Sequence, residues 1–314
     1  MNITLREMGD ELKKLNRIVV TGHVNPDGDA VGSALALAAI LKQLGKDVRV
    51  VFNDDMPRNF SILPYRSEIE KPPENGEKIP ADALVIVDAS PDRIGRVLEC
   101  VDAPILNIDH HVSNDGEGRK LYCDPDSAAT AEIIFKLGMD LNVELTKEIA
   151  ACIYVGIATD SGFFCYSNTT PRTLWIASKL LEVGVRPNVI SEVLEERPLA
   201  VIVGLGEALR TLELWHDGKA AGIFLDRELT SKLETTEGFI DQIRVIEGVD
   251  VALMLKCTGE NVCRVSMRSK NVDVTKIALQ FDGGGHIRAA GCTLKMPFDE
   301  AKKAIVDAID RELS

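Results

Sequence analysis

The first half of the chain alternates short apolar runs with longer segments that are apolar or amphipathic. Four runs have the length of a buried strand: 17–22, 47–52, 83–88 and 103–109. The segment 30–44 ends at Gly45, and a glycine directly after the last periodic residue is a common C-terminal helix cap. Strands that are apolar throughout and alternate with helices predict a parallel sheet with helices on both faces. We therefore expect an α/β fold for this half.

The pattern changes after residue 200. Helices are predicted before that point at 128–137, 145–156, 171–181 and 186–198. Beyond it the turn pair Asp217-Gly218 predicts a hairpin at 211–225. Further elements are predicted in this order: strands at 251–257, 262–267 and 291–296, and a closing helix at 298–313. These elements predict a smaller α+β domain with an antiparallel sheet. We expect a first domain at 1–187, a linker at 188–200 and a second domain at 201–314.

Composition narrows the class of protein. The 314 residues are 45% hydrophobic and 27% charged, which is ordinary for a soluble globular chain. No stretch reaches about 18 uninterrupted apolar residues, and the N-terminus lacks the apolar run of a signal peptide. We expect a cytoplasmic protein with no membrane partner. The seven cysteines show no C-x-x-C spacing, so we expect reduced, mostly buried thiols.

The charge balance argues against a long nucleic acid groove. The chain has 36 basic and 49 acidic residues, a net charge of −13, whereas such grooves carry a basic patch or stripe. A small anionic ligand stays compatible with this balance, because bound divalent cations reverse the local sign of a pocket.

Polar residues follow the ends of three predicted strands. His23, Asp88 and Asp109 each stand at or just after the end of an apolar run. In parallel sheets ligands bind outside the carboxyl ends of the strands. The sequence therefore places candidate chemistry at the edge where the fold predicts a site.

One group of residues is typical of a metal centre. His23, Asp27 and Asp29 lie within one short loop, and the triplet 109–111 adds two imidazoles to a further carboxylate. Together with Asp160 these carboxylates would repel one another, and a divalent cation relieves that repulsion. Mixed histidine and carboxylate ligands suit manganese better than calcium or magnesium. For the first loop alone, a capped helix start is an open alternative.

At these residues the sequence resembles the DHH phosphoesterases, named for the triplet found here as Asp109-His110-His111. The match covers nearly the whole chain and rests on these segments: 23–30, the strand ending in Asp88, 109–111, 156–163, 283–286 and 289–291. The resemblance implies a DHH domain followed by a DHH-associated domain. Within the family it is greatest to the bacterial nano-RNase and pAp phosphatase group.

The resemblance implies two divalent metal ions, expected to be manganese, that share one carboxylate. Their ligands are His23, Asp27 and Asp88 for one ion, and Asp29, Asp88, His110 and Asp160 for the other. His111 is expected to contact the substrate phosphate or assist proton transfer. Asp109 is expected to orient a ligand imidazole from outside the metal sphere.

The second domain is expected to bind the substrate. Gly283, Gly284 and Gly285 would let the backbone approach an anion, with His286 as a hydrogen-bond donor. A flexible turn is the alternative for the glycines alone. Arg268 is assigned to the nucleotide phosphate by the resemblance.

The function that follows is hydrolysis of short oligoribonucleotides to mononucleotides, and of 3′-phosphoadenosine 5′-phosphate, by a water activated between two metals. The close alternative is a phosphodiesterase of cyclic di-AMP or its linear product pApA, because the same metal site serves both. The substrates are expected to be short RNA or small nucleotides, and the sequence leaves a monomer and a homodimer open.

Three other functions are weighed and fit less well. Family II inorganic pyrophosphatases share the loop 23–29 but lack the triple-glycine-histidine motif, and RecJ exonucleases are longer than this chain. A non-catalytic nucleotide-binding regulator would not need the complete ligand set.

Overall fold

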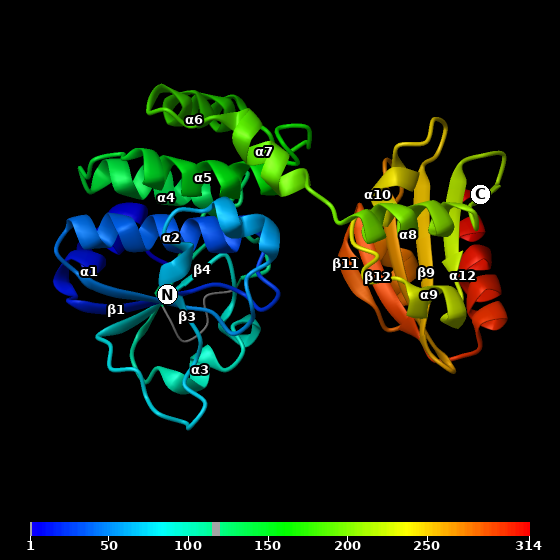
Figure 1. The fold of residues 1–314 in the computed structure, drawn as a ribbon, viewed down its shortest axis with the longest axis horizontal. Coiled ribbons are helices and arrows are strands. Elements are labelled where there is room, and N and C mark those ends of the chain that lie inside the picture. The colour runs from blue at the N-terminus through cyan, green and yellow to red at the C-terminus, as the bar shows by residue number, and fades with distance from the viewer. Residues whose placement is uncertain (1, 115–119) are drawn as a thin grey trace. The chain divides into compact units, whose positions relative to one another are not determined.

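The computed structural model describes residues 2–114 and 120–314. They form two compact units, divided in the chain between residues 196 and 197, and this boundary lies between two helices, α7 (Pro187–Glu195) and α8 (Leu199–Leu209). The range 188–200 therefore consists largely of helix. Each unit has its own sheet, as the ribbon in Figure 1 shows.

The first unit contains a parallel sheet in the order β3-β2-β1-β4-β5-β6. Its strands are β1 (Arg17–Thr21), β2 (Asp47–Val51), β3 (Ile69–Glu70), β4 (Ala83–Val87), β5 (Ile105–Asp109) and β6 (Lys120–Cys123). The four predicted strands are confirmed. The edge strands β3 and β6 were not predicted, because two to four residues without an apolar run carry no readable period.

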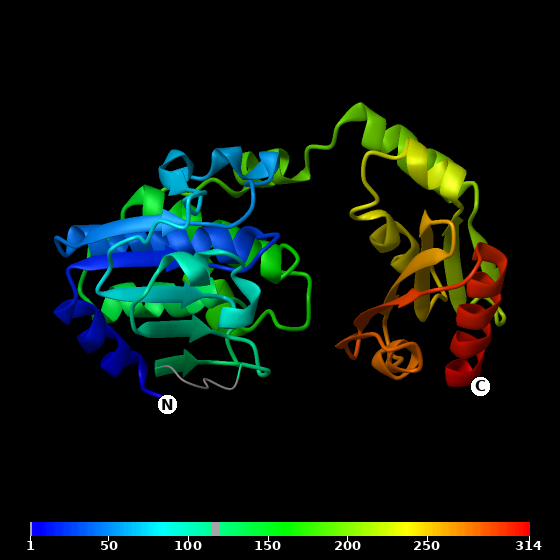
Figure 2. The same cartoon turned by 90° about the horizontal axis from the view of Figure 1, so that it is seen from below.

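Helices cover both faces of this sheet, which confirms the predicted fold class (Figures 1 and 2). Val20 points into a core shared with α1 (Leu5–Lys14), α2 (Gly28–Gln43), α4 (Thr130–Asp140) and α5 (Lys147–Asp160). Its neighbour Val19 points to the other face, where α3 (Val97–Cys100) contributes Val97. The remaining helices of this unit are α6 (Pro171–Glu182), α7 and the short 3₁₀ helices η1 (Arg58–Ile62), η2 (Arg66–Glu68) and η3 (Pro91–Arg93).

The second unit contains a mixed sheet in the order β11-β12-β10-β9-β8-β7. Its strands are β7 (Glu213–Trp215), β8 (Ala220–Leu225), β9 (Val251–Gly259), β10 (Val262–Ser269), β11 (Gly284–His286) and β12 (Ala289–Leu294). The expectation of a purely antiparallel sheet is wrong, because β8 and β9 are parallel. The connection between them holds α9 (Arg227–Lys232) and α10 (Phe239–Arg244), long enough for the crossover that a parallel pair needs.

Helices lie on both faces of the second sheet as well. Leu253 packs in a core with α11 (Thr275–Leu279) and α12 (Phe298–Leu313). Met254, on the opposite face, packs with residues of α8 and α10. Among the described helices, none combines the length and the apolar character that crossing a bilayer requires.

Candidate metal centre

The loop after β1 delivers three of the predicted ligands. His23 follows the strand, and Asp27 caps α2 by accepting hydrogen bonds from the backbone nitrogens of Asp29 at 3.1 Å and Ala30 at 3.0 Å. Asp29 lies in the first turn of the same helix and is fully buried. Asp27 therefore caps the helix, as the alternative interpretation of this loop expects. It also faces His23, with 3.5 Å between its Oδ1 and the histidine Nε2, so the two roles are compatible.

Two neighbouring strands and one helix end deliver the rest. Asp88 follows β4 with a positive φ of 57°, an uncommon conformation for a residue other than glycine. Asp109 is the last residue of β5, and His110 and His111 come directly after it. Asp160 is the last residue of α5. Helix α5 comes close to this edge because Gly156 has no side chain: a Cβ there would lie 2.8 Å from Oδ1 of Asp29.

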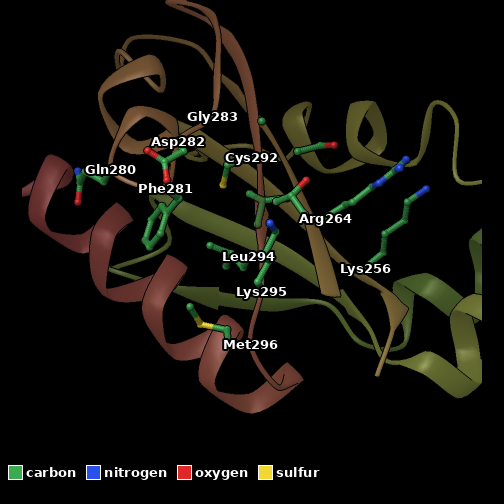
Figure 3. Close-up of a pocket in the computed structure, with 14 residues that line it drawn as sticks. Lys256, Arg264, Gln280, Phe281, Asp282, Gly283, Cys292, Leu294, Lys295 and Met296 are labelled. Carbon is green, nitrogen blue, oxygen red and sulfur yellow. The ribbon is translucent and has the colours of Figure 1, made fainter. Parts of the chain in front are cut away.

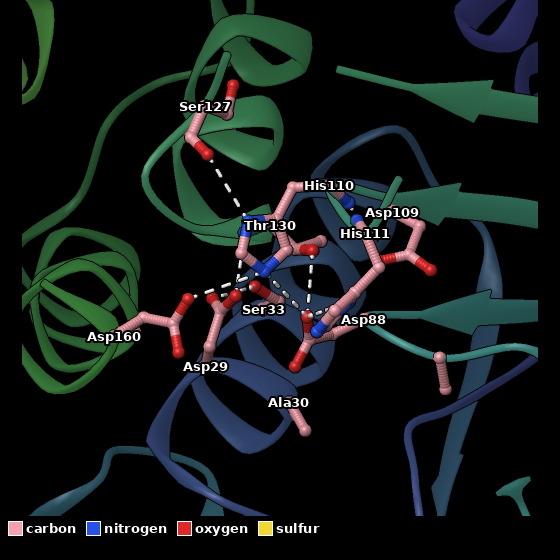
Figure 4. Close-up of polar contacts among 12 residues, drawn as sticks. Asp29, Ala30, Ser33, Asp88, Asp109, His110, His111, Ser127, Thr130 and Asp160 are labelled. Atoms are coloured by element: carbon pink, nitrogen blue, oxygen red, sulfur yellow. Dashed lines mark hydrogen bonds and ion pairs between the residues drawn. The ribbon is translucent and has the colours of Figure 1, made fainter. Parts of the chain in front are cut away.

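Asp88 lies between the two halves of the cluster. Its Oδ2 is 3.6 Å from Nε2 of His23, and its Oδ1 is 3.5 Å from Nε2 of His110. The same nitrogen of His110 is 3.3 Å from Oδ2 of Asp160. Figure 4 shows Asp29, Asp88 and Asp160 directed toward the His110 ring. The structure thus brings together residues that are up to 137 positions apart in the sequence (His23 to Asp160).

Backbone carbonyls orient the two imidazoles. His23 Nδ1 is 2.9 Å from the carbonyl oxygen of Val24, and His110 Nδ1 is 3.2 Å from that of Ser127. A proton on Nδ1 in each ring leaves the lone pair of Nε2, which faces the carboxylates, available to a cation. This is the arrangement in which histidine binds a metal.

Burial and crowding shift the protonation equilibria of these residues. Burial, followed by repulsion from Asp88 and Asp160, raises the pKa of Asp29 well above its usual value. Burial and the nearby carboxylates Asp88 and Asp27 raise the pKa of Asp160 to about 7, although His110 opposes this. Burial disfavours the charged form of His23, but Asp27 and Asp88 outweigh it and raise its pKa to about 10. The same balance, with Asp88 and Asp29 as partners, raises the pKa of His110 to about 10.

These raised pKa values mean that the carboxylates and imidazoles of the pocket retain protons when no cation is bound. A bound cation would replace those protons. Donor atoms within 4.8 Å of one another form three groups: His23, Asp27 and Asp88; Asp29, His110 and Asp160; and Asp88, His110 and His111. The chemistry of the donors, imidazole nitrogen with carboxylate oxygen, fits a borderline divalent cation such as manganese. The residues present therefore fit bound divalent cations, and Asp88 belongs to two of the three groups.

Asp109 and His111 form a pair beside this cluster. Oδ1 of Asp109 accepts hydrogen bonds from the backbone nitrogens of His110 at 2.7 Å and His111 at 3.0 Å, and from Nδ1 of His111 at 2.8 Å. Burial opposes the charged form of Asp109, but hydrogen bonds from His111 and Asn114 hold its pKa below the usual value. The Asp109 hydrogen bond in turn raises the pKa of His111.

The substrate residues predicted in the second unit lie on or beside two strands, β10 and β11, with β12 between them. Arg268 on β10 pairs in register with Ala289 on β12, which pairs with His286 on β11. Because cross-strand partners share a face, Arg268 and His286 lie on the same side of the sheet on either side of Ala289. His286 is exposed and Arg268 is partly exposed.

The triple-glycine segment is partly a strand rather than the predicted loop, because Gly284 to His286 pair with β12. A Cβ on Gly283 would lie 2.3 Å from the carbonyl oxygen of Gly291, and one on Gly285 would lie 2.4 Å from that of Ala289. A Cβ on Gly284 would meet nothing within 4 Å. Strand packing thus accounts for two of the three glycines and leaves Gly284 without such a reason.

A cavity of about 890 Å³ opens on the second sheet next to this segment (Figure 3). Gly283 and Phe281 line one part of it, and Lys256 and Arg264, which are register partners on β9 and β10, line another. Burial, with Arg264 nearby, lowers the pKa of Lys256. Arg268 and His286 do not line this cavity.

Several residues that build the site had no signal in the sequence. Ser33, Ser127 and Thr130 contact predicted ligands through ordinary polar groups: Ser33 Oγ donates to Asp29 at 3.0 Å, and Thr130 Oγ1 donates to Asp88 at 3.1 Å. Asn114 lies three residues after His111, and this short spacing is the only feature of the sequence that indicates a place near the site. Serine, threonine and asparagine are common in loops, so only their contacts single them out.

Comparison with known proteins places the chain among relatives over nearly its whole length. A family model for the DHH family, N-terminal domain, matches residues 17–157, and one for the DHHA1 domain matches residues 229–314. The chain is 38% identical over 301 residues to the bifunctional oligoribonuclease and PAP phosphatase NrnA of Thermus thermophilus, covering 95% of this chain and 90% of that protein. It is 29% identical over 299 residues to the protein of the same name from Bacillus subtilis, covering 92% and 93%.

A solved structure has the same overall fold. The crystal structure of an exopolyphosphatase-related protein from Bacteroides fragilis superimposes with a TM-score of 0.90 at 26% identity, covering 98% of this chain and 96% of that one.

Proposed function

The chain belongs to the DHH family of phosphoester hydrolases, and from that premise we propose that it hydrolyses short oligoribonucleotides and 3′-phosphoadenosine 5′-phosphate with two manganese ions. The resemblance to relatives named as oligoribonuclease and PAP phosphatase supports the substrate class. The observation that carries the two-metal mechanism is the position of Asp88, whose two oxygens face His23 on one side and His110 on the other.

The residues have separate tasks in this mechanism. His23, Asp27 and Asp88 would hold one cation, and Asp29, Asp88, His110 and Asp160 would hold the other. Two bound divalent cations supply a water of lowered pKa and stabilise charge on the attacking and leaving oxygens. Asp109 holds Nδ1 of His111, so the opposite nitrogen of that ring is directed to a phosphoryl oxygen of the substrate or to the leaving oxygen, where it places a proton.

The second unit binds the nucleotide end of the substrate in this proposal. Arg268 supplies a permanent positive charge, and His286 supplies a donor on the same face of the sheet. The open space at Gly284 lets the backbone approach a phosphate group. These three residues make a patch suited to one phosphate rather than to a long strand.

A substrate panel with manganese tests the proposal. It contains a dinucleotide RNA, a longer single strand, 3′-phosphoadenosine 5′-phosphate, cyclic di-AMP, pApA and pyrophosphate. Release of mononucleotides from the dinucleotide, faster than from the long strand, supports the proposal. Preference for cyclic di-AMP or pApA would replace it with second-messenger turnover at the same site. The Asp88→Asn variant, prepared in parallel, controls for contaminating nucleases.

A further inference from the structure

We propose that Asn114 is a positioning residue that fixes His111 in its working orientation by way of Asp109. Nδ2 of Asn114 donates a hydrogen bond to Oδ2 of Asp109 at 2.7 Å. This inference rests on the proposed function, because the orientation of His111 matters only if that ring meets the substrate.

Asn114 holds the oxygen of Asp109 that His111 does not use. Among the described residues, the other oxygen, Oδ1, accepts three hydrogen bonds, all from His110 and His111, while Oδ2 accepts from Asn114. A carboxylate held at one oxygen alone can rotate about its terminal bond, since such torsions are broad. Hydrogen bonds at both oxygens fix its plane, and that plane sets the direction of the Nδ1 bond to His111.

A second asparagine decides which way the Asn114 amide points. Nδ2 of Asn107 donates to the carbonyl oxygens of Ile86 at 3.0 Å and Ala89 at 2.9 Å. Oδ1 of Asn107 is therefore turned to Asn114, whose Nδ2 lies 2.8 Å away. An amide nitrogen has two hydrogens, and the two nearest acceptors of Asn114 Nδ2 are Asn107 and Asp109, whereas the carbonyl oxygen of Ala89 is farther away, at 3.4 Å.

The chain of contacts is anchored in the sheet. Asn107 lies on β5 and is fully buried, Asp109 ends the same strand and is 1% exposed, and Asn114 is 8% exposed. A buried polar group without a hydrogen-bond partner destabilises the fold, so these buried side chains are expected to keep their hydrogen bonds to one another. The hydrogen bonds connect the backbone of β4 to Asn107, then to Asn114, to Asp109 and finally to the ring of His111. The side chain of His111 is 30% exposed.

The chemical consequence is control of one imidazole. A carboxylate on Nδ1 sets the tautomer and direction of a catalytic histidine ring. Loss of an outer partner of this kind costs roughly 10- to 100-fold in activity.

The test is a double-mutant cycle between Asn114→Leu and His111→Asn, with manganese and the dinucleotide RNA. In the wild-type background Asn114→Leu should lower kcat by roughly 10- to 100-fold and leave KM and manganese affinity unchanged. In the His111→Asn background the same change should lower kcat no further, because its target is gone. Equal losses in both backgrounds, or a loss of manganese affinity, would overturn the proposal.

Two additions keep the test decisive. Asn114→Ala removes both donors without adding bulk or charge, so it should reproduce the kcat loss if the leucine variant does not fold. Thr173→Val is the matched control: it removes the hydrogen bonds that the side chain of the buried Thr173 makes with Thr170 at the start of α6, in the same unit, and should leave kcat unchanged.

A readout without turnover separates this inference from the proposed function. In ¹⁵N-histidine spectra the Nδ1 proton of His111, assigned with His111→Asn, should be protected in the wild type and lost or shifted in Asn114→Leu. The signals of His23 and His110 should keep their positions. An unchanged His111 signal would overturn the inference even if the enzyme acts on none of the panel substrates.

Discussion

The backbone nitrogen of Thr130 donates a hydrogen bond of 2.6 Å to Oδ2 of Asp29, so helix α4 begins at a fully buried carboxylate. The nitrogen of Ala131 adds a second bond, of 2.9 Å, to Oδ1 of the same group. The positive end of a helix stabilises negative charge. The start of helix α4 therefore fixes the position of a predicted metal ligand, and it opposes without reversing the effect of burial and of the neighbouring carboxylates, which raise the pKa of Asp29.

Asp88→Asn should remove metal-dependent turnover. The amide keeps the size of the side chain but is a weaker metal ligand than the carboxylate at both proposed metal positions. We therefore expect kcat to fall by more than about 100-fold, because about 100-fold is the upper cost of removing a residue that only supports a metal ligand. The measurement is kcat with manganese, alongside circular dichroism to verify the fold. Asp82→Asn is the matched control, because Asp82 accepts bonds from the backbone of Asn16 and Arg17 instead. Undiminished turnover in Asp88→Asn would contradict the shared-carboxylate site.

Stabilisation by manganese should grow as pH rises between about 5 and 8. Asp160 has a folded pKa of about 7 against the usual 3.8, and His23 and His110 have about 10 against 6.5. A group whose pKa is raised by folding contributes stability at low pH that is lost as pH rises through the folded value. All these shifts have the same sign, so the metal-free protein should become less stable across this range.

Metal binding requires the deprotonated forms, so the difference in Tm between manganese-loaded and chelator-treated protein is the quantity to follow. Carboxylates with lowered pKa, such as Asp109, have the opposite sign, but they are already ionised above about pH 5. A Tm difference that shrinks with rising pH would show that these histidines and carboxylates do not bind the metal.

Substitutions of the neighbouring residues His110 and His111 should have different effects, one on metal binding and the other on kcat. His110→Asn should weaken manganese binding, because its Nε2 faces both Asp88 and Asp160. His111→Asn should keep manganese binding and lower kcat by about 10²- to 10⁴-fold, the range for a lost proton donor. Titration calorimetry with manganese and steady-state kinetics check the two arms. Equal losses of metal affinity in both variants would place His111 in the metal sphere.

The three glycines of the second unit should respond differently to alanine. Gly283→Ala and Gly285→Ala should lower the Tm, because each new Cβ would lie within 2.4 Å of a backbone oxygen. Gly284→Ala should leave the Tm unchanged and raise KM, if a substrate phosphate occupies the open space there. An unchanged KM in Gly284→Ala would assign this segment to strand packing alone.

The sequence by itself determined the fold of the first unit and singled out residues that the structure gathers at one edge of its sheet. The apolar runs at β1, β4 and β5 lead to His23, Asp88 and Asp109, and in a parallel sheet such ends meet at one edge. Local spacing was sufficient there because each of these residues ends its strand or follows it within two positions. Both ends of helix α12 were predicted correctly, because its apolar residues recur with an uninterrupted helical period.

Tertiary structure alone decided what surrounds those ligands. The parallel pairing of β8 with β9, the contact of Thr130 with Asp29 and the chain from Asn107 through Asn114 to His111 join segments with no shared period or spacing. Polar side chains such as asparagine and threonine are equally common in solvated loops. They acquire a role only when folding buries them, because a buried donor must then find the one acceptor within reach.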